Sequence, residues 1–206
     1  MSAPQRREGI LDAALEEFSM NGYHETSLEG VADRAGISKA LIYEHFSSKR
    51  ELHEALLSRY DREVLDRVIA AIATAHPLED RLKATAEAFF GFVEENREPW
   101  RLIVRNPGVT GVDESVGQNQ KDMAQAIASV LVPDAPPEMM TSPEAGRFEL
   151  EMIAQQMLGA WRGVAIWWDD HRDVPRERLV QAIMNVGWMG LERLSQGEMW
   201  EGGSRV

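Results

Sequence analysis

The chain has 206 residues and a formal net charge of −12, with 44% apolar and 27% charged residues. These values are typical of a folded globular protein, and they exclude one that coats nucleic acid indiscriminately, because so acidic a chain repels phosphate. The absence of cysteine excludes disulfides and thiolate metal sites, and the lack of an apolar run suited to a bilayer or a signal peptide leads us to expect a cytoplasmic protein.

The residues before Gly22 predict a helix. Apolar residues recur at helical spacing from Ile10 to Phe18, and the Asn-Gly pair at 21–22 is a typical helix end. TSLE at 26–29 and SKRE at 48–51 both have the spacing of a capping box, in which a hydroxyl accepts a backbone N–H and a glutamate reaches back to the cap. Each stretch therefore marks the start of a further helix.

The stretch 27–46 has the pattern of a helix-turn-helix, in which two short helices pack across a tight turn. Gly36 can adopt the left-handed conformation that such a turn needs. In the second helix Ile42 and Phe46 are expected to face the core, although an ordinary corner of a helical bundle would have the same pattern. The opposite face, left to solvent or to a groove, consists of Lys39, Ala40, Leu41, Tyr43, Glu44 and His45.

The remainder of the chain predicts longer helices and no β-type alternation of useful length, so the expected fold class is all-α. The proline-rich stretch VPDAPPEMMTSP at 132–143 is the clearest break in the chain. The expected helices span 49–76, 78–96, 99–105, 113–131, 143–169 and 175–196.

These elements predict two domains. A three-helix domain at 4–50 contains the helix-turn-helix at about 27–46, and a larger helical domain spans 51–200. The acidic residues concentrate in the second part, since residues 1–60 carry a balance of −3 and residues 61–206 one of −9. The helix at 49–76 begins in the first domain and ends in the second, so it links the two.

The last two helices are apolar around most of their girth, and a helix of this kind must be covered on more than one side. Packing of the pair against the same pair of a second subunit would cover the outer side, which predicts a homodimer. The alternative is a deeply buried core pair in a monomer. The predicted interface residues are Trp168, Leu179, Ile183, Val186, Gly190 and Leu194.

The larger domain is also rich in aromatic residues and methionine, and methionine suits cavities that adapt to their contents. An apolar ligand cavity is therefore plausible, although each residue taken alone could equally belong to the core. The candidate ligand-binding residues are Phe89, Phe92, Trp100, Met123, Met157 and Trp161.

A longer motif unites the N-terminal features. T-S-x-x-x-V-A-x-x-A-G-I-S-x-A-x-I-Y-x-H-F-x-S-K-x-x-L, at 26–52, resembles the N-terminal signature of the TetR family of transcriptional regulators. The resemblance covers about the first quarter of the chain, and the rest agrees in helical architecture only. It implies a DNA-binding helix-turn-helix domain followed by a divergent helical domain for ligand binding and dimerisation.

The resemblance assigns DNA contacts to matching positions. Ser38 and Lys39 would open the recognition helix, and Lys49 would bind phosphate at the start of the next helix. Position 41 is often small in the family, whereas Leu41 can only pack against an apolar group such as a thymine methyl. The implied DNA-binding residues are Thr26, Ser27, Ser38, Lys39, Ala40, Leu41, Tyr43, His45 and Lys49.

The function implied is that of a ligand-responsive transcriptional repressor, which binds a palindromic operator as a homodimer and is released by a small-molecule inducer. A helical dimer without DNA binding, structural or enzymatic, is the alternative. Catalysis is not expected, because GISKA at 36–40 lacks the preceding strand of a nucleophile elbow. No metal or cofactor is expected either, because no histidine pair has ligand spacing.

Overall fold

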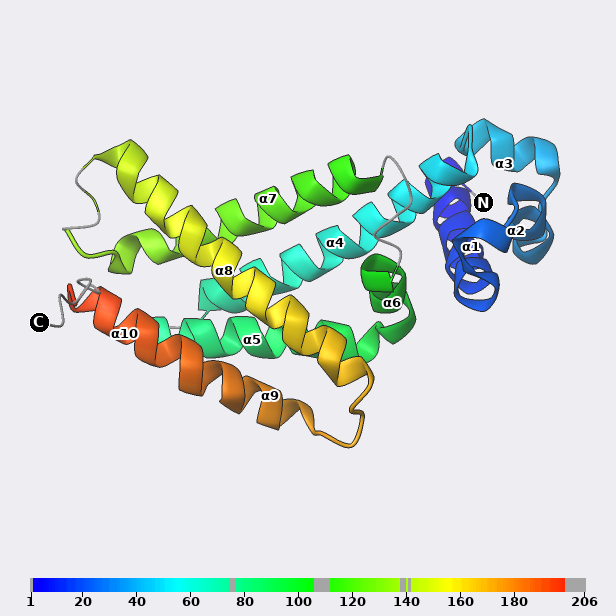
Figure 1. Ribbon diagram of the computed structural model, residues 1–206. Coiled ribbons are helices and arrows are strands. Elements are labelled where there is room, and N and C mark those ends of the chain that lie inside the picture. The colour runs from blue at the N-terminus through cyan, green and yellow to red at the C-terminus, as the bar shows by residue number, and fades with distance from the viewer. Residues whose placement is uncertain (1, 75–76, 106–111, 138–139, 141, 199–206) are drawn as a thin grey trace, which may run out of the picture. The chain divides into compact units, whose positions relative to one another are not determined.

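The computed structural model describes residues 2–74, 77–105, 112–137, 140 and 142–198, and every regular element among them is a helix (Figure 1). This confirms the all-α fold class. Among the described residues no helix is long and apolar enough to cross a membrane. The predicted loop at 106–111, and residues 199–200 of the predicted second domain, lie outside the described residues.

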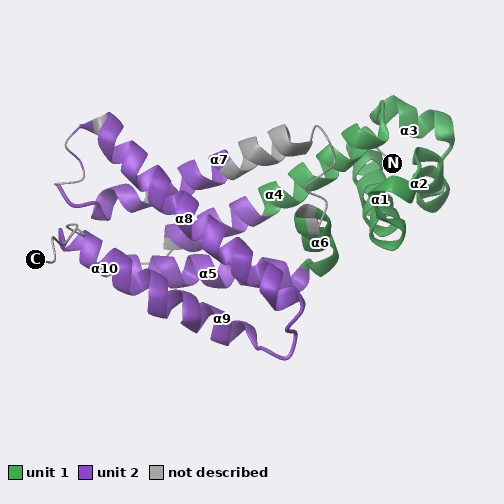
Figure 2. Cartoon of the chain, viewed as in Figure 1, with its two compact units in different colours: residues 1–63, 96–120 green, residues 64–95, 121–206 purple. Residues whose placement is uncertain are grey.

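The chain divides into two compact units, coloured separately in Figure 2. Unit 1 consists of residues 1–63 and 96–120, and unit 2 of residues 64–95 and 121–206. Helix α4 (Lys49–Thr74) contributes residues to both units. The geometric division thus falls inside α4, and the functional domain limits of 4–50 and 51–200 stay predictions.

Unit 1 is built on three N-terminal helices whose ends are set by local side chains. Ser2 caps the first helix in a complete capping box with Gln5, and Gly22 breaks its regular geometry with φ 73° and ψ 170°. That break lies where the sequence predicted the helix end. The helices of this unit are α1 (Ala3–Glu25), α2 (Leu28–Ala35), α3 (Lys39–His45), the first part of α4, α6 (Arg97–Arg105), which contacts α1, and the first part of α7 (Val112–Leu131).

The core of unit 1 collects one apolar face from each of these helices. Phe18 of α1, Ile42 of α3 and Leu52 of α4 are almost completely buried, and Phe46 closes the space after α3. Burial of side chains of this size contributes roughly 1.5–3 kcal/mol each. This core fixes which faces of α2 and α3 remain outside.

Unit 2 contains longer helices around an aromatic core. Phe90 packs edge-on against Trp168, with ring centroids 6.2 Å apart, and both rings are buried. The helices are the remaining parts of α4 and α7, together with α5 (Leu78–Glu95), the 3-10 turn η1 (Val132–Asp134), α8 (Pro143–Asp169), α9 (Arg176–Ile183) and α10 (Met189–Ser195).

Helices α9 and α10 are joined by the π-helical turn η2 (Met184–Trp188), so 176–195 is one helical run, close to the predicted 175–196. This run packs along α5, and the two lie side by side in Figure 1. Leu179, Val180 and Ile183 supply its buried side.

Candidate DNA-binding site

The turn between α2 and α3 has the geometry that its sequence predicts. Gly36 is left-handed, with φ 65° and ψ 34°, a conformation that is costly for residues with a Cβ. The next amide, Ile37 N–H, donates to the carbonyl of Ala32 at 3.0 Å and closes the end of α2. Ser38 then caps α3 by accepting the N–H of Leu41 at 3.2 Å. The chain therefore reverses between two short helices within a few residues.

Helix α3 has one buried side and one open side. Ile42 and the following Phe46 are buried, whereas Tyr43 is 49% exposed and Lys39 and Ala40 are exposed. Leu41 and His45 are half-buried at the edges of the open side. The predicted DNA-reading residues of α3 thus lie on a face that the unit's own core does not use.

The start of α2 differs in detail from the prediction. Ser27 is the N-cap of α2 and accepts the N–H of Gly30 at 3.0 Å, so the prediction of a capping box at 26–29 is wrong. Glu29 pairs instead with Lys39 of α3. Thr26 is buried, and its hydroxyl donates to the carbonyl of Gly22 at 2.8 Å, which leaves Ser27 as the exposed hydroxyl at this corner.

Lys49 has a place that the sequence did not predict. Its Nζ donates to the main-chain carbonyls of Tyr23, His24 and Thr26, at 2.7, 2.9 and 2.8 Å, and lies 4.7 Å from the centre of the Tyr23 ring. An ammonium has three N–H donors, so these carbonyls occupy all of them. In this geometry Lys49 fixes the α1–α2 corner and has no N–H left for phosphate.

The second capping box is present in a modified form. Ser48 accepts the N–H of Glu51 at 3.1 Å, as predicted, but the carboxylate of Glu51 accepts from the N–H and the hydroxyl of Ser47. These two hydrogen bonds lower the pKa of Glu51 below its ordinary value. The start of α4 is therefore bound to the segment that leaves α3.

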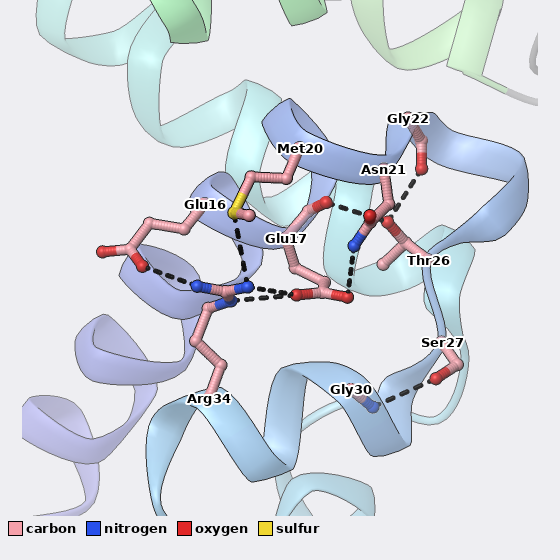
Figure 3. A network of polar contacts seen from close by, with 9 residues as sticks. All are labelled: Glu16, Glu17, Met20, Asn21, Gly22, Thr26, Ser27, Gly30 and Arg34. Carbon is pink, nitrogen blue, oxygen red and sulfur yellow. Dashed lines mark hydrogen bonds and ion pairs between the residues drawn. The ribbon is translucent and has the colours of Figure 1, made fainter.

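A polar network joins α1 to α2 (Figure 3). Arg34 pairs with Glu16 at 3.1 Å and with Glu17 at 2.9 Å, and Glu17 also accepts from Asn21 at 2.7 Å. These bonds raise the pKa of Arg34, so its charge is retained. Gly30 faces this network, since a Cβ there would lie 3.0 Å from Glu17 Oε1. Close approach of the helices and the ion pairs together hold α2 in place.

Comparison with known proteins decides the family. The model described as "Bacterial regulatory proteins, tetR family" matches residues 10–56, and "Tetracyclin repressor-like, C-terminal domain" matches residues 78–190. The chain belongs to the TetR family. It is therefore a DNA-binding transcriptional regulator and not an enzyme, which excludes the enzymatic and purely structural alternatives.

Individual TetR-family relatives agree over different lengths. The HTH-type transcriptional activator FasR of Mycolicibacterium smegmatis is 33% identical over 193 residues, which are 92% of this chain and 84% of FasR. The regulator RutR of Escherichia coli is 43% identical over 61 residues, or 30% of this chain and 27% of RutR. The stronger identity over the shorter match is what a shared DNA-binding domain predicts.

Solved structures extend the likeness to the fold. A TetR-like regulator from Rhodococcus sp. RHA1 has 26% identity and a TM-score of 0.71, covering 93% of this chain and 98% of its own. FadR of Bacillus subtilis, solved in complex with stearoyl-CoA, has a TM-score of 0.71 over 92% of this chain and 98% of its own, at 17% identity. At that identity FadR supports the fold alone.

The predicted ligand-binding residues of this TetR-family chain do not form one cavity in the described structure. Met157 lines a small cavity, whereas Phe89 and Trp161 pack against each other with ring centroids 5.9 Å apart. Phe92 is buried beneath the guanidinium of Arg67. Trp100 belongs to unit 1, and Met123 of α7 is half-buried in unit 2.

The predicted dimer residues separate into two groups. Trp168, Leu179 and Ile183 are buried within the chain's own core, so they are not available to a second subunit. Val186 and Gly190 are exposed, and Leu194 is half-buried. The predicted interface does not include an exposed strip on α8, which carries Phe148, Met152, Gly159, Gly163, Ile166 and Trp167.

Proposed function

We propose that this TetR-family regulator binds a roughly palindromic operator as a homodimer and is released by a small-molecule effector bound in unit 2. The observation that carries this proposal is the open face of α3, opposite buried Ile42 and Phe46, in a short helix whose start Ser38 caps. Two such helices would occupy successive major grooves about 34–36 Å apart. Because a regulator of this kind would act on bacterial DNA, we propose that the protein acts in the cytoplasm.

Control by a ligand would act through α4, which shares its residues between the two units. An effector would weaken operator binding if it bound more tightly to the form of the dimer in which the spacing of the two α3 helices does not match successive major grooves. A coupling free energy of about 1–3 kcal/mol, or roughly 5–150-fold, is typical of such regulation. No particular pathway through the protein is required, because only the difference in effector affinity between the two states matters.

Repression is the first candidate for the sign of regulation, because an operator-bound dimer can block transcription without any further contact. Activation is the second candidate, and the FasR relative supports it because that protein is named an activator. Deleting the gene and measuring transcripts next to the bound operator separates the two. Transcript levels rise if the protein represses and fall if it activates.

Selection of genomic fragments followed by a gel shift tests the DNA-binding part. We expect sequence-selective binding at moderate salt.

Leu41→Ala should change the preferred base at one position of each half-site, because a leucine packs against a base edge without hydrogen bonds. A lost apolar contact of this kind should cost about 1–3 kcal/mol of discrimination at that position. Tyr43→Phe keeps the ring and serves as the control. An unchanged base preference in Leu41→Ala would exclude a groove contact for Leu41.

The homodimer is proposed to form through the exposed strip of α8 and its counterpart on η2 and α10. Ile166 and Trp167 are exposed on α8, and Val186 and Met189 are exposed on the last helical run. Glycines at 159, 163 and 190 have no atom within 4 Å of an added Cβ, so a partner helix can approach closely there. An isologous packing of these two helices on their copies would cover the strip.

Substituting Val186 with aspartate should weaken this dimer at least tenfold, because Val186 is 81% exposed in the chain and a carboxylate would be desolvated at the interface. Analytical ultracentrifugation over a range of concentrations measures the dissociation constant. Ile69→Asp makes the same change at an exposed position of α4 and should leave the dimer intact. Equal behaviour of the two variants would move the interface elsewhere.

A further inference from the structure

Arg81 is a charged residue on the buried side of α5. It lies among Leu78, Leu82 and Thr85 and is only 8% exposed. Placing a guanidinium in such surroundings is costly unless its donors are paired, because charge is poorly solvated in an apolar interior. Burying arginine at this position costs more free energy than burying leucine would, so the charge needs a partner that compensates for the lost hydration.

The pairing of Arg81 is incomplete. Its Nη2 forms an ion pair with Oδ2 of Asp134 on the 3-10 turn η1, and the Asp134 side chain is 32% exposed. The Arg81 Nε is buried and has no hydrogen-bond partner among the described residues. Nε and Nη2 lie on the same edge of the guanidinium, which is the edge that a carboxylate engages with both oxygens. Asp134 therefore occupies one half of a two-donor site.

The ion pair stands between two small apolar cavities of unit 2. Arg81 and Thr85 line one cavity and Asp134 lines the other, and both cavities share Leu78 and Leu131. Each holds about 20 Å³, enough for roughly one water molecule. A ligand must therefore displace side chains, and Met157 in the wall of the first cavity is suited to that because its unbranched chain has several rotamers.

We propose that Arg81 anchors the anionic group of the effector, and that the effector is an amphipathic carboxylic acid. This inference rests on the proposed ligand-responsive function. Asp134 neutralises Arg81 in the free protein. The incoming carboxylate displaces Asp134 and engages Nε and Nη2 together, while its apolar body separates the residues that line the two cavities. Displaced Asp134 returns to water, which its partial exposure already permits.

Isothermal titration of the full chain with dodecanoate and with dodecanamide tests the anchor. The two probes share an apolar tail and differ in the charge of the head group. We expect the wild type to bind dodecanoate at least tenfold more tightly than dodecanamide, since a paired, charge-assisted contact is lost in the amide. Equal binding of the two probes, or no binding of dodecanoate, would overturn the proposal.

Two variants with opposite expected effects separate an anchor from a structural ion pair. Asp134→Asn removes the competing carboxylate and should tighten dodecanoate binding several-fold, whereas Arg81→Met should abolish the preference for the acid over the amide. A purely structural pair would give weaker or unchanged binding in Asp134→Asn, and that result overturns the anchor even if Arg81→Met fails to fold. Thermal unfolding of both variants reports their integrity.

The same probes added to an operator gel shift distinguish this inference from the proposed function. Release of the operator by dodecanoate, and not by dodecanamide, supports both. Selective operator binding that ignores dodecanoate overturns the carboxylate effector and leaves the regulator standing. Absence of selective operator binding overturns the proposed function itself, whatever the titrations give.

Discussion

Lys49→Ala is expected to lower the free energy of unfolding by about 3 kcal/mol and to weaken operator binding about a hundredfold. The stability loss follows because three main-chain carbonyls at the α1–α2 corner lose a charged donor, and one such hydrogen bond contributes about 1.5–3 kcal/mol. The binding loss follows because a shifted corner moves Ser27 and α2 in each subunit of the proposed homodimer, and a loss of about 1.4 kcal/mol in each of the two amounts to a hundredfold. Urea denaturation and a gel shift measure the two effects.

The salt dependence of operator binding distinguishes the position of Lys49 from its predicted role. If its ammonium bound a phosphate, as the family resemblance implies, its loss would lower the salt slope by about one for each contact. If the ammonium holds the carbonyls of Tyr23, His24 and Thr26, affinity should fall while the slope stays unchanged. A lowered slope with normal stability would contradict the structural role.

Arg50→Ala provides the matched control for this experiment. Arg50 is the next residue along α4, and its exposed Nε lies 3.7 Å from Oε1 of Glu54. Removing it deletes the same charge at nearly the same place. We expect stability to change by no more than about 0.5 kcal/mol, as is usual for an exposed ion pair.

The sequence predicted most helix limits correctly because those limits depend on neighbouring residues. Helix α8 spans Pro143–Asp169 as expected, with its start capped by Ser142. The turn at Gly36 and the buried side of α3 follow from a small residue and a short apolar stripe in the same way. Local hydrogen bonds and periodicity carry all of this information.

What the sequence did not predict depends on residues far apart along the chain. Lys49 binds main-chain carbonyls that precede it by 23 to 26 positions in the sequence. Arg34 pairs with Glu17 and Glu16, which precede it by 17 and 18 positions. The spacing of a motif marks such residues as special, but it does not say whether they face DNA or their own protein. For Lys49 the family pattern and the folded contacts suggest different roles.

The larger unit shows a second limit of sequence patterns. A helix that is apolar on all sides does not reveal which side faces its own chain. Trp168 and Leu179 were therefore predicted to lie in the dimer interface, although both are buried in the core of the single chain. Arg81 is the one charged residue on the buried stripe of α5 that includes Leu78, Leu82 and Thr85. A charge at a core position is a better indication of binding than another aromatic residue.

His53 gives the second large effect, on stability at acid pH. The ring is completely buried, with Phe18 and Tyr23 edge-on at 5.0 and 4.9 Å, and neither nitrogen has a hydrogen-bond partner among the described residues. Burial lowers the pKa of His53 from 6.5 to about 4, because the charged ring would be poorly solvated there. The folded protein therefore holds His53 neutral where the unfolded chain protonates it.

The sign of the effect follows from that difference. Below the unfolded pKa of 6.5 the unfolded chain binds a proton that the folded chain does not bind. The free energy of unfolding therefore decreases as the pH is lowered from 6.5 to the folded pKa near 4. Between pH 7 and pH 5 the contribution of His53 is a loss of stability on the order of 2 kcal/mol.

His53→Leu removes the titrating group while filling a similar volume, so urea denaturation should show a correspondingly smaller loss of stability over that interval. His24→Gln, which removes an exposed histidine, is the matched comparison variant. If His53→Leu also follows the wild type, the buried ring of His53 does not cause the acid sensitivity.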